Sequence, residues 1–144
     1  MNYISISEFE DYIGAVESAD LIESTGADYT RILTNSLNYA EGEVDGYAGK
    51  LYTIPLPASN LVKKWALAIA RLDVFYRAKG KNPPEKYITD YDKVVKQLVD
   101  MANGMVIPPP DTSGDLPTSA TTAGNSIDVT SDTSVMDETS MKDF

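Results

Sequence analysis

Apolar residues recur every three or four positions along three stretches of this chain, and that spacing predicts three α-helices. The first is expected from Asp28, as its N-cap, to about Tyr47. The second begins at Ser59 or Asn60, and the third runs from Pro84 to a stop at Gly104. The residues expected to form the core on these faces are Leu33, Leu37, Val44, Trp65, Ile69, Leu72, Tyr91, Val95 and Leu98.

Two shorter helices are expected ahead of the first long one. Ser7 and Glu10 have the spacing of a capping box and would open a helix that ends near Ile13. Residues 18–23 form another turn or two before Gly26 breaks them. Residues 1–104 hold no convincing strand pattern, so the predicted fold class is all-α: a small helical bundle with two long helices, one intermediate helix and short N-terminal helices.

The segment that joins the first two long helices, residues 50–57, is expected to be extended and stiff. Gly46 and Gly49 can take the left-handed geometry that ends a helix. Pro55 and Pro57 fix their own φ and hold the preceding residues out of the helical region. A stiff backbone loses little entropy on docking. We therefore expect an interface with a neighbouring subunit or another protein at Leu51, Tyr52, Ile54 and Leu56.

The composition of the 144-residue chain changes near Gly104. Residues 1–104 hold every Tyr and Trp, whereas residues 105–144 are rich in Ser, Thr, Asp and Pro. The latter carry seven acidic residues and one basic residue, a net charge of −6, which leaves −4 of the total −10 for the former. The sequence predicts a folded domain over residues 1–104 and an extended C-terminal tail over residues 105–144.

The residue types most often used for catalysis and metal binding are missing. The chain has no Cys and no His, which excludes thiolate and imidazole chemistry. Three carboxylate clusters remain: Glu41 with Glu43 and Asp45, Asp90 with Asp92, and Glu8 with Glu10 and Asp11. None has the spacing of an EF-hand, and helices place such residues on solvated faces. We expect exposed acids, no cofactor, no metal site and no enzymatic activity.

The charge and hydropathy exclude two further kinds of partner. A net charge of −10 opposes binding to nucleic acid through its phosphates. The basic residues of the second long helix, Lys63, Lys64, Arg71 and Arg77, are expected to pair with neighbouring acids. The strongest apolar run, residues 65–70, is far shorter than the roughly 20 residues that span a bilayer, so no membrane partner is expected.

Several segments between Tyr3 and Gly104 together carry a resemblance. They are Tyr3-Ile4-Ser5, Ala19-Asp20-Leu21-Ile22-Glu23, Ala40-Glu41-Gly42-Glu43-Val44-Asp45-Gly46-Tyr47, Leu51-Tyr52-Thr53-Ile54-Pro55-Leu56, Trp65-Ala66-Leu67-Ala68-Ile69-Ala70-Arg71 and Asn103-Gly104. In this arrangement the chain resembles the head–tail adaptor, or head completion, proteins of tailed bacteriophages of the Mu-like type. Residues 43–56 are the most specific part.

The resemblance implies a structural protein of the virion, assembled in the host cytoplasm, that forms a ring between portal and tail and extends the DNA channel. Such rings are closed cyclic assemblies, usually of about twelve copies. The implied partners are the portal protein, neighbouring copies and the next tail component, a stopper or tail terminator. DNA would pass through without specific binding, because an acidic wall repels its backbone.

The tail is expected to bind the portal or an adjacent copy in an extended form. An alternating pattern places Ile127, Val129 and Val135 on one side, so this part could add as a strand to a partner's sheet edge. Met141 or Phe144 would anchor the end. The opposing hypothesis is a tail that only solubilises the protein.

Two other function classes stay open. The chain could be a small acidic protein-binding module, such as a DNA mimic or an inhibitor, whose acidic surface acts as a decoy. A metal-dependent enzyme built from the carboxylate pairs ranks last. Size-exclusion chromatography with light scattering distinguishes the adaptor, which forms rings or binds portal, from a mimic that stays small.

Overall fold

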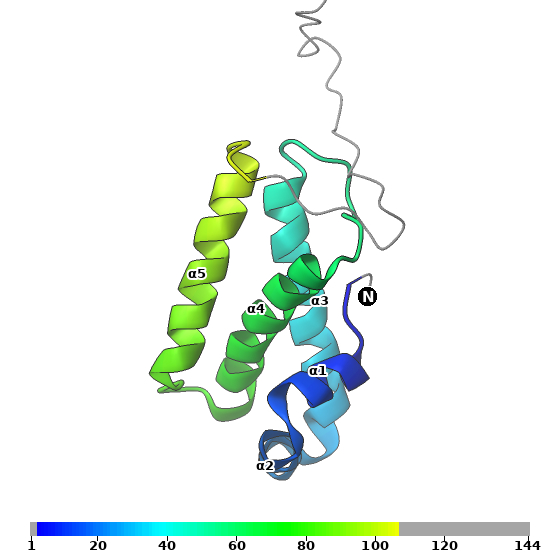
Figure 1. The fold of residues 1–144 in the computed structure, drawn as a ribbon. Coiled ribbons are helices and arrows are strands. Elements are labelled where there is room, and N and C mark those ends of the chain that lie inside the picture. Colours follow the sequence, from blue (N-terminus) through cyan, green and yellow to red (C-terminus); the bar gives the residue numbers. More distant parts are fainter. Residues whose placement is uncertain (1–2, 107–144) are drawn as a thin grey trace, which may run out of the picture.

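The computed structural model describes residues 3–106, whose elements are five α-helices and one short 3-10 helix. The three long helices α3 (Tyr29–Ala48), α4 (Asn60–Lys79) and α5 (Glu85–Ala102) run alternately up, down and up (Figure 1). They contain 20, 20 and 18 residues. α1 (Ile6–Ile13), α2 (Ala15–Thr25) and the 3-10 turn Gly26–Asp28 lie at the end where α3 begins. The expected all-α bundle is confirmed.

α1 begins two residues earlier than the sequence predicts, because Ser5 and not Ser7 is its N-cap. The Ser5 Oγ accepts the N–H of Glu8 at 3.2 Å, and Glu8 Oε2 accepts the N–H of Ser5 at 2.8 Å. The sequence offers this spacing twice, two residues apart. The earlier box places Ile4 and Phe9 at the positions of a hydrophobic staple, and both are buried in the core. The burial of Ile4 and Phe9 therefore favours the capping box of Ser5 and Glu8 over that of Ser7 and Glu10.

Gly26 ends α2 as the sequence predicts, but the glycines near the end of α3 do not act as expected. α2 is longer than the turn or two predicted, and it lies between Gly14 and Gly26, which have φ values of 87° and 54°. Gly46 stays inside α3, and Gly49 follows it with an ordinary φ of −61°. A Cβ at Gly49 would lie 3.1 Å from the carbonyl oxygen of Asp45, a tight contact that a shift of a few tenths of an ångström would have to relieve. The predicted left-handed exit from α3 is wrong.

The core lies between the three long helices and extends to α1 and α2. Trp65 is 1% exposed, and its Nε1 donates to Gln97 Oε1 at 2.7 Å. The expected core residues that are buried are Leu33, Leu37, Val44, Trp65, Ile69, Leu72 and Leu98. Tyr91 and Val95 are only partly buried, which corrects the expectation. Val94 and Met101 are buried together with Leu98, because these residues lie three or four positions apart and share the inner face of α5.

Among residues 3–106, no helix is long and apolar enough to cross a bilayer.

Candidate interaction surface

The N-terminal segment is bound to α3 through backbone and side-chain hydrogen bonds. Glu41 Oε1 accepts the N–H of Tyr3 at 2.9 Å and the N–H of Ile4 at 3.2 Å. Glu41 is 5% exposed, and Tyr3 is 3% exposed. A buried carboxylate that accepts two backbone N–H groups is a structural acid, because those donors would otherwise be desolvated without a partner.

The phenol of Tyr3 joins α3 to the segment that follows it. It donates to Asp45 Oδ1 and accepts the backbone N–H of Leu56 at 2.7 Å. Asp45 lies in the last turn of α3, whereas Leu56 lies near the end of the α3–α4 loop. We call these contacts of Tyr3 with Glu41, Asp45 and Leu56 the Tyr3 clamp. The clamp fixes the far end of the loop against the helix that the loop leaves.

Burial, followed by the hydrogen bond to Asp45, raises the pKa of Tyr3 far above its ordinary value of 10.0. Desolvation disfavours the phenolate, and the neighbouring carboxylate disfavours a second negative charge. Tyr3 is therefore protonated at neutral pH and can donate to Asp45. The clamp is formed in full under ordinary solution conditions.

The α3–α4 loop, residues 49–59, presents part of its apolar side chains to solvent. Leu51 is 38% exposed and Ile54 is 46% exposed, while Tyr52 is partly buried and packs against the core. Leu56 is 3% exposed and belongs to the core. It is thus withdrawn from the expected interface set, because its side chain is enclosed in the core. Leu51, Tyr52 and Ile54 remain predicted interface residues.

A second surface lies between α3, α4 and α5. It is a groove of about 340 Å³ whose lining includes Tyr39, Tyr76, Ile88, Tyr91 and the acids Asp73 and Asp92. We call it the tyrosine groove. Glu43 Oε1 accepts the hydroxyl of Tyr91 at 2.9 Å and fixes that ring from below. Residue spacing alone does not predict this groove, although Tyr39 lies off the predicted apolar face of the first long helix and could have indicated an exposed aromatic residue.

The acidic residues near the end of α3 are not simply solvated, contrary to expectation. Glu41 and Asp45 belong to the Tyr3 clamp, and Glu43 holds Tyr91. Glu8 caps α1 and also pairs with Lys63 Nζ at 2.6 Å. Within residues 3–106, no group of three or more acidic side chains is arranged to hold a metal ion. Their carboxylates bind parts of the same chain.

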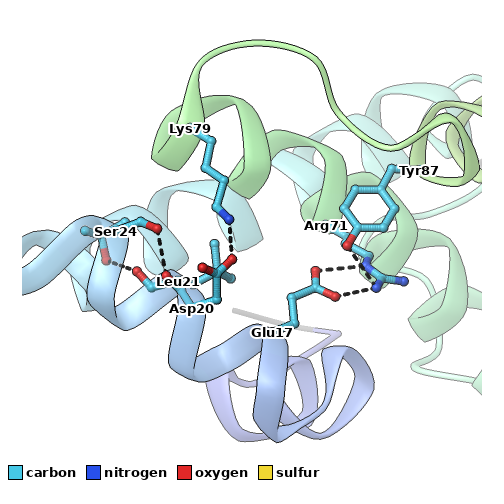
Figure 2. Close-up of polar contacts among 8 residues, drawn as sticks. Glu17, Asp20, Leu21, Ser24, Arg71, Lys79 and Tyr87 are labelled. Carbon is cyan, nitrogen blue, oxygen red and sulfur yellow. Dashed lines mark hydrogen bonds and ion pairs between the residues drawn. The ribbon is translucent and has the colours of Figure 1, made fainter.

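Charge pairs fasten α2 to the bundle, as Figure 2 shows. Arg71 of α4 faces Glu17 of α2, and its Nε donates to Glu17 Oε1 at 3.1 Å. Its Nη2 contacts Glu17 and also donates to the Tyr87 hydroxyl at 3.1 Å. The guanidinium carbon lies 4.1 Å from the centroid of the Tyr87 ring. Lys79 pairs with Asp20 at the next turn of α2. The cations are neutralised, so this cluster serves to join helices.

Three of the four basic residues expected in ion pairs on α4 have them: Lys63 with Glu8, Arg71 with Glu17, and Arg77 with Asp73.

A comparison with protein families finds one whose pattern fits nearly the whole chain. The family described as Bacteriophage Mu, Gp36 matches residues 3–126. This chain belongs to that family. A comparison with curated individual proteins gives no match.

Membership in the Bacteriophage Mu, Gp36 family indicates a phage protein of the structural or morphogenesis class. The match begins at Tyr3, the residue at the centre of the clamp, and it includes both the α3–α4 loop and the tyrosine groove. It also continues to residue 126, beyond Gly104, where the resemblance of the sequence was expected to end. The first part of the tail therefore belongs to the family pattern.

The tail residues expected to bind a partner, Ile127, Val129, Val135, Met141 and Phe144, lie outside the residues that the structure describes. Their role stays a prediction.

Proposed function

We propose that this protein is a head–tail adaptor that forms a ring between the portal and the tail of a bacteriophage and extends the DNA channel. Its partners would be the portal protein, neighbouring copies and the next tail component, with DNA passing through unbound. The observation that supports this proposal is the clamped α3–α4 loop, which carries exposed Leu51 and Ile54 on a chain of a phage structural family.

An adaptor needs docking elements that are rigid before they bind. The loop meets this need because Tyr3 bonds the backbone of Leu56 on one side and Asp45 of α3 on the other. Holding an apolar loop in one conformation reduces the entropy lost on association. Leu51 and Ile54 are 38% and 46% exposed although both are apolar, and exposed apolar side chains on a fixed loop favour an interaction surface.

The acidic decoy is the weaker alternative. A DNA mimic requires carboxylates spaced along an exposed face, whereas Glu41, Asp45 and Glu17 are engaged in contacts within the chain. The net charge of the folded part is also only −4. These two observations favour a structural adaptor.

A phage carrying a stop codon in this gene tests the proposal. DNA-filled heads and free tails that fail to join, seen by electron microscopy, are expected, and the wild-type gene supplied from a plasmid should restore joined particles. Purified protein should add a ring of density to isolated portal. Infectious, fully joined particles made without the gene product would refute the adaptor role.

Two matched variants connect the function to the loop. Ile54→Asp places a charge on the exposed loop and should fail to restore joined particles. Val16→Asp, at an 87% exposed position of α2, should restore them. Val16→Asp should melt within a few degrees of wild type, because substitutions at exposed positions usually change stability by less than about 0.5 kcal/mol. Ile54 is 46% exposed, so thermal melting of Ile54→Asp must show that this variant is folded at the temperature of the assay.

A further inference from the structure

We infer that the tyrosine groove of one copy receives residues 50–54 of the α3–α4 loop of a second copy. This inference rests on the proposed ring, and it names the two surfaces that would meet in it. The contact joins unlike surfaces, head to tail, and such contacts close into rings when the rotation between copies allows it.

The groove has the composition of a protein-docking site. Tyr39, Tyr76 and Ile88 are 47%, 45% and 38% exposed and stand around a hollow of about 340 Å³. Tyrosine is enriched in interfaces because it offers a large, rigid ring with one polar atom. Glu43 Oε1 accepts the hydroxyl of Tyr91 at 2.9 Å, so this aromatic wall is ordered before a partner arrives.

The charges of the groove select the occupant. Its lining holds the acids Asp73 and Asp92 and no lysine or arginine. Asp73 is paired with Arg77, whereas Asp92 is exposed at the edge. A fitting partner would carry apolar side chains beside a cation and no acid of its own.

The α3–α4 loop has this combination. Lys50 is exposed and stands directly before Leu51, and Ile54 follows on the same short segment. Residues 49–59 contain no acidic residue. Leu51 and Ile54 would enter the groove, and Lys50 would lie near Asp92. An opposite arrangement of charge would cost affinity and slow association.

One copy cannot make this contact with itself. The loop lies at the end of the bundle where α3 stops, whereas Tyr76 and Ile88 flank the α4–α5 connection at the opposite end (Figure 1). Each copy therefore offers its α3–α4 loop to one neighbour and its tyrosine groove to another. Repetition of this contact can close a ring.

Cysteine cross-linking of the full chain tests the pairing with no background, because the protein has no Cys of its own. A disulfide requires Cα atoms about 4.4–6.8 Å apart, so its formation reports close contact. The double variant Ile54→Cys with Ile88→Cys should give a ladder of covalent multimers on mild oxidation. An equal mixture of the two single variants should stop at dimers, at a yield about tenfold above either alone, since only docked pairs hold the thiols at bonding distance.

Two controls sharpen the result. The double variant Val16→Cys with Ile88→Cys pairs the groove with an exposed residue of α2, and it should give no ladder. Adding Asp92→Lys to the Ile54→Cys, Ile88→Cys chain should weaken the ladder, and adding Lys50→Glu as well should restore it.

The outcomes separate this inference from the adaptor role. A ladder that the charge reversal weakens and restores supports the pairing. Cross-linking of Ile54→Cys alone would indicate a symmetric contact between loops and would overturn it, as would the absence of a ladder at every protein concentration. Either result leaves the head–tail joining of the stop-codon phage as an independent measure of the adaptor role.

Discussion

Replacing Tyr3 with Phe removes one oxygen atom and tests the role of the clamp. The ring, which is 3% exposed, keeps its packing, but the hydroxyl that donates to Asp45 and accepts from Leu56 is lost. The buried N–H of Leu56 then has no hydrogen-bond acceptor. Leaving one buried donor unsatisfied costs about 1–3 kcal/mol.

The expected loss of unfolding free energy is therefore about 1–3 kcal/mol, which for a folded part of this size lowers the melting temperature by about 4 °C or more. Urea denaturation and thermal melting measure it directly. Hydrogen exchange should report a local effect, because the amide of Leu56 loses its protection before the amides in the centres of α3 and α4. Tyr76→Phe removes the same atom from a 45% exposed residue and serves as the matched control.

Equal stability of the Tyr3→Phe and wild-type proteins, with unchanged exchange at Leu56, would refute the clamp. A large loss of stability with uniform exchange throughout the bundle would show that the hydroxyl supports the whole fold and does not act on the loop. Only a loss concentrated at the loop and the N-terminal segment agrees with the contacts described here.

Three further predictions follow from the same contacts. Trp65→Ala should destabilise the protein by about 3–5 kcal/mol in urea denaturation, because it empties the centre of the core; a change below 1 kcal/mol would remove Trp65 from the core. Glu41→Ala should cost about 1.5–3 kcal/mol, since two backbone donors lose a charged acceptor, whereas Glu41→Gln keeps an acceptor oxygen and should cost less. Folding favours the protonated phenols, because burial and the hydrogen bond to Glu10 raise the pKa of Tyr29 to about 12, and the pKa of Tyr3 is raised further. This stabilisation is complete below about pH 10 and is lost as the pH rises beyond it. The urea midpoint should fall across that range, and less steeply in Tyr3→Phe.

The spacing of apolar residues predicts the long helices well, because each helix is long enough for its apolar face to be recognised even where single positions depart from the pattern. α3 begins directly after Asp28 and ends one residue beyond the expected Tyr47, and α4 begins directly after Ser59. The stripe also identifies most of the core. It misplaces Tyr91 and Val95 because both lie at the edge of the buried face, where a small rotation of α5 decides their exposure.

The polar contacts could not be predicted from spacing along the chain. Tyr3 and Asp45 are 42 positions apart, and Tyr3 and Leu56 are 53 apart. The same limit explains the error for Glu41, whose helix position resembles that of any solvated acid until the N-terminal segment folds over it. The prolines predict the apolar extended segment after α3, but nothing in the local sequence predicts the burial of Leu56 or its hydrogen bond to Tyr3, 53 positions away.

The clamp makes the proposed docking surface depend on Tyr3, which is buried and lies outside that surface. Leu51 and Ile54 are exposed, so their positions are not fixed by packing in the core. The loop that carries them is fixed at its start by Gly49, which hydrogen-bonds Asp45, and near its end by the bond from Leu56 to Tyr3. Both attachments involve Asp45 of α3: its backbone carbonyl accepts the N–H of Gly49, and its carboxylate accepts the hydroxyl of Tyr3.

A loop held at both ends loses less conformational entropy on binding than a free one with the same side chains. Tyr3→Phe should therefore weaken the cross-linking of Ile54→Cys to Ile88→Cys although neither position changes. If the ladder kept its full yield while Leu56 lost its protection from exchange, the loop would bind through its side chains alone, and the ordering supplied by Tyr3 would be irrelevant to docking.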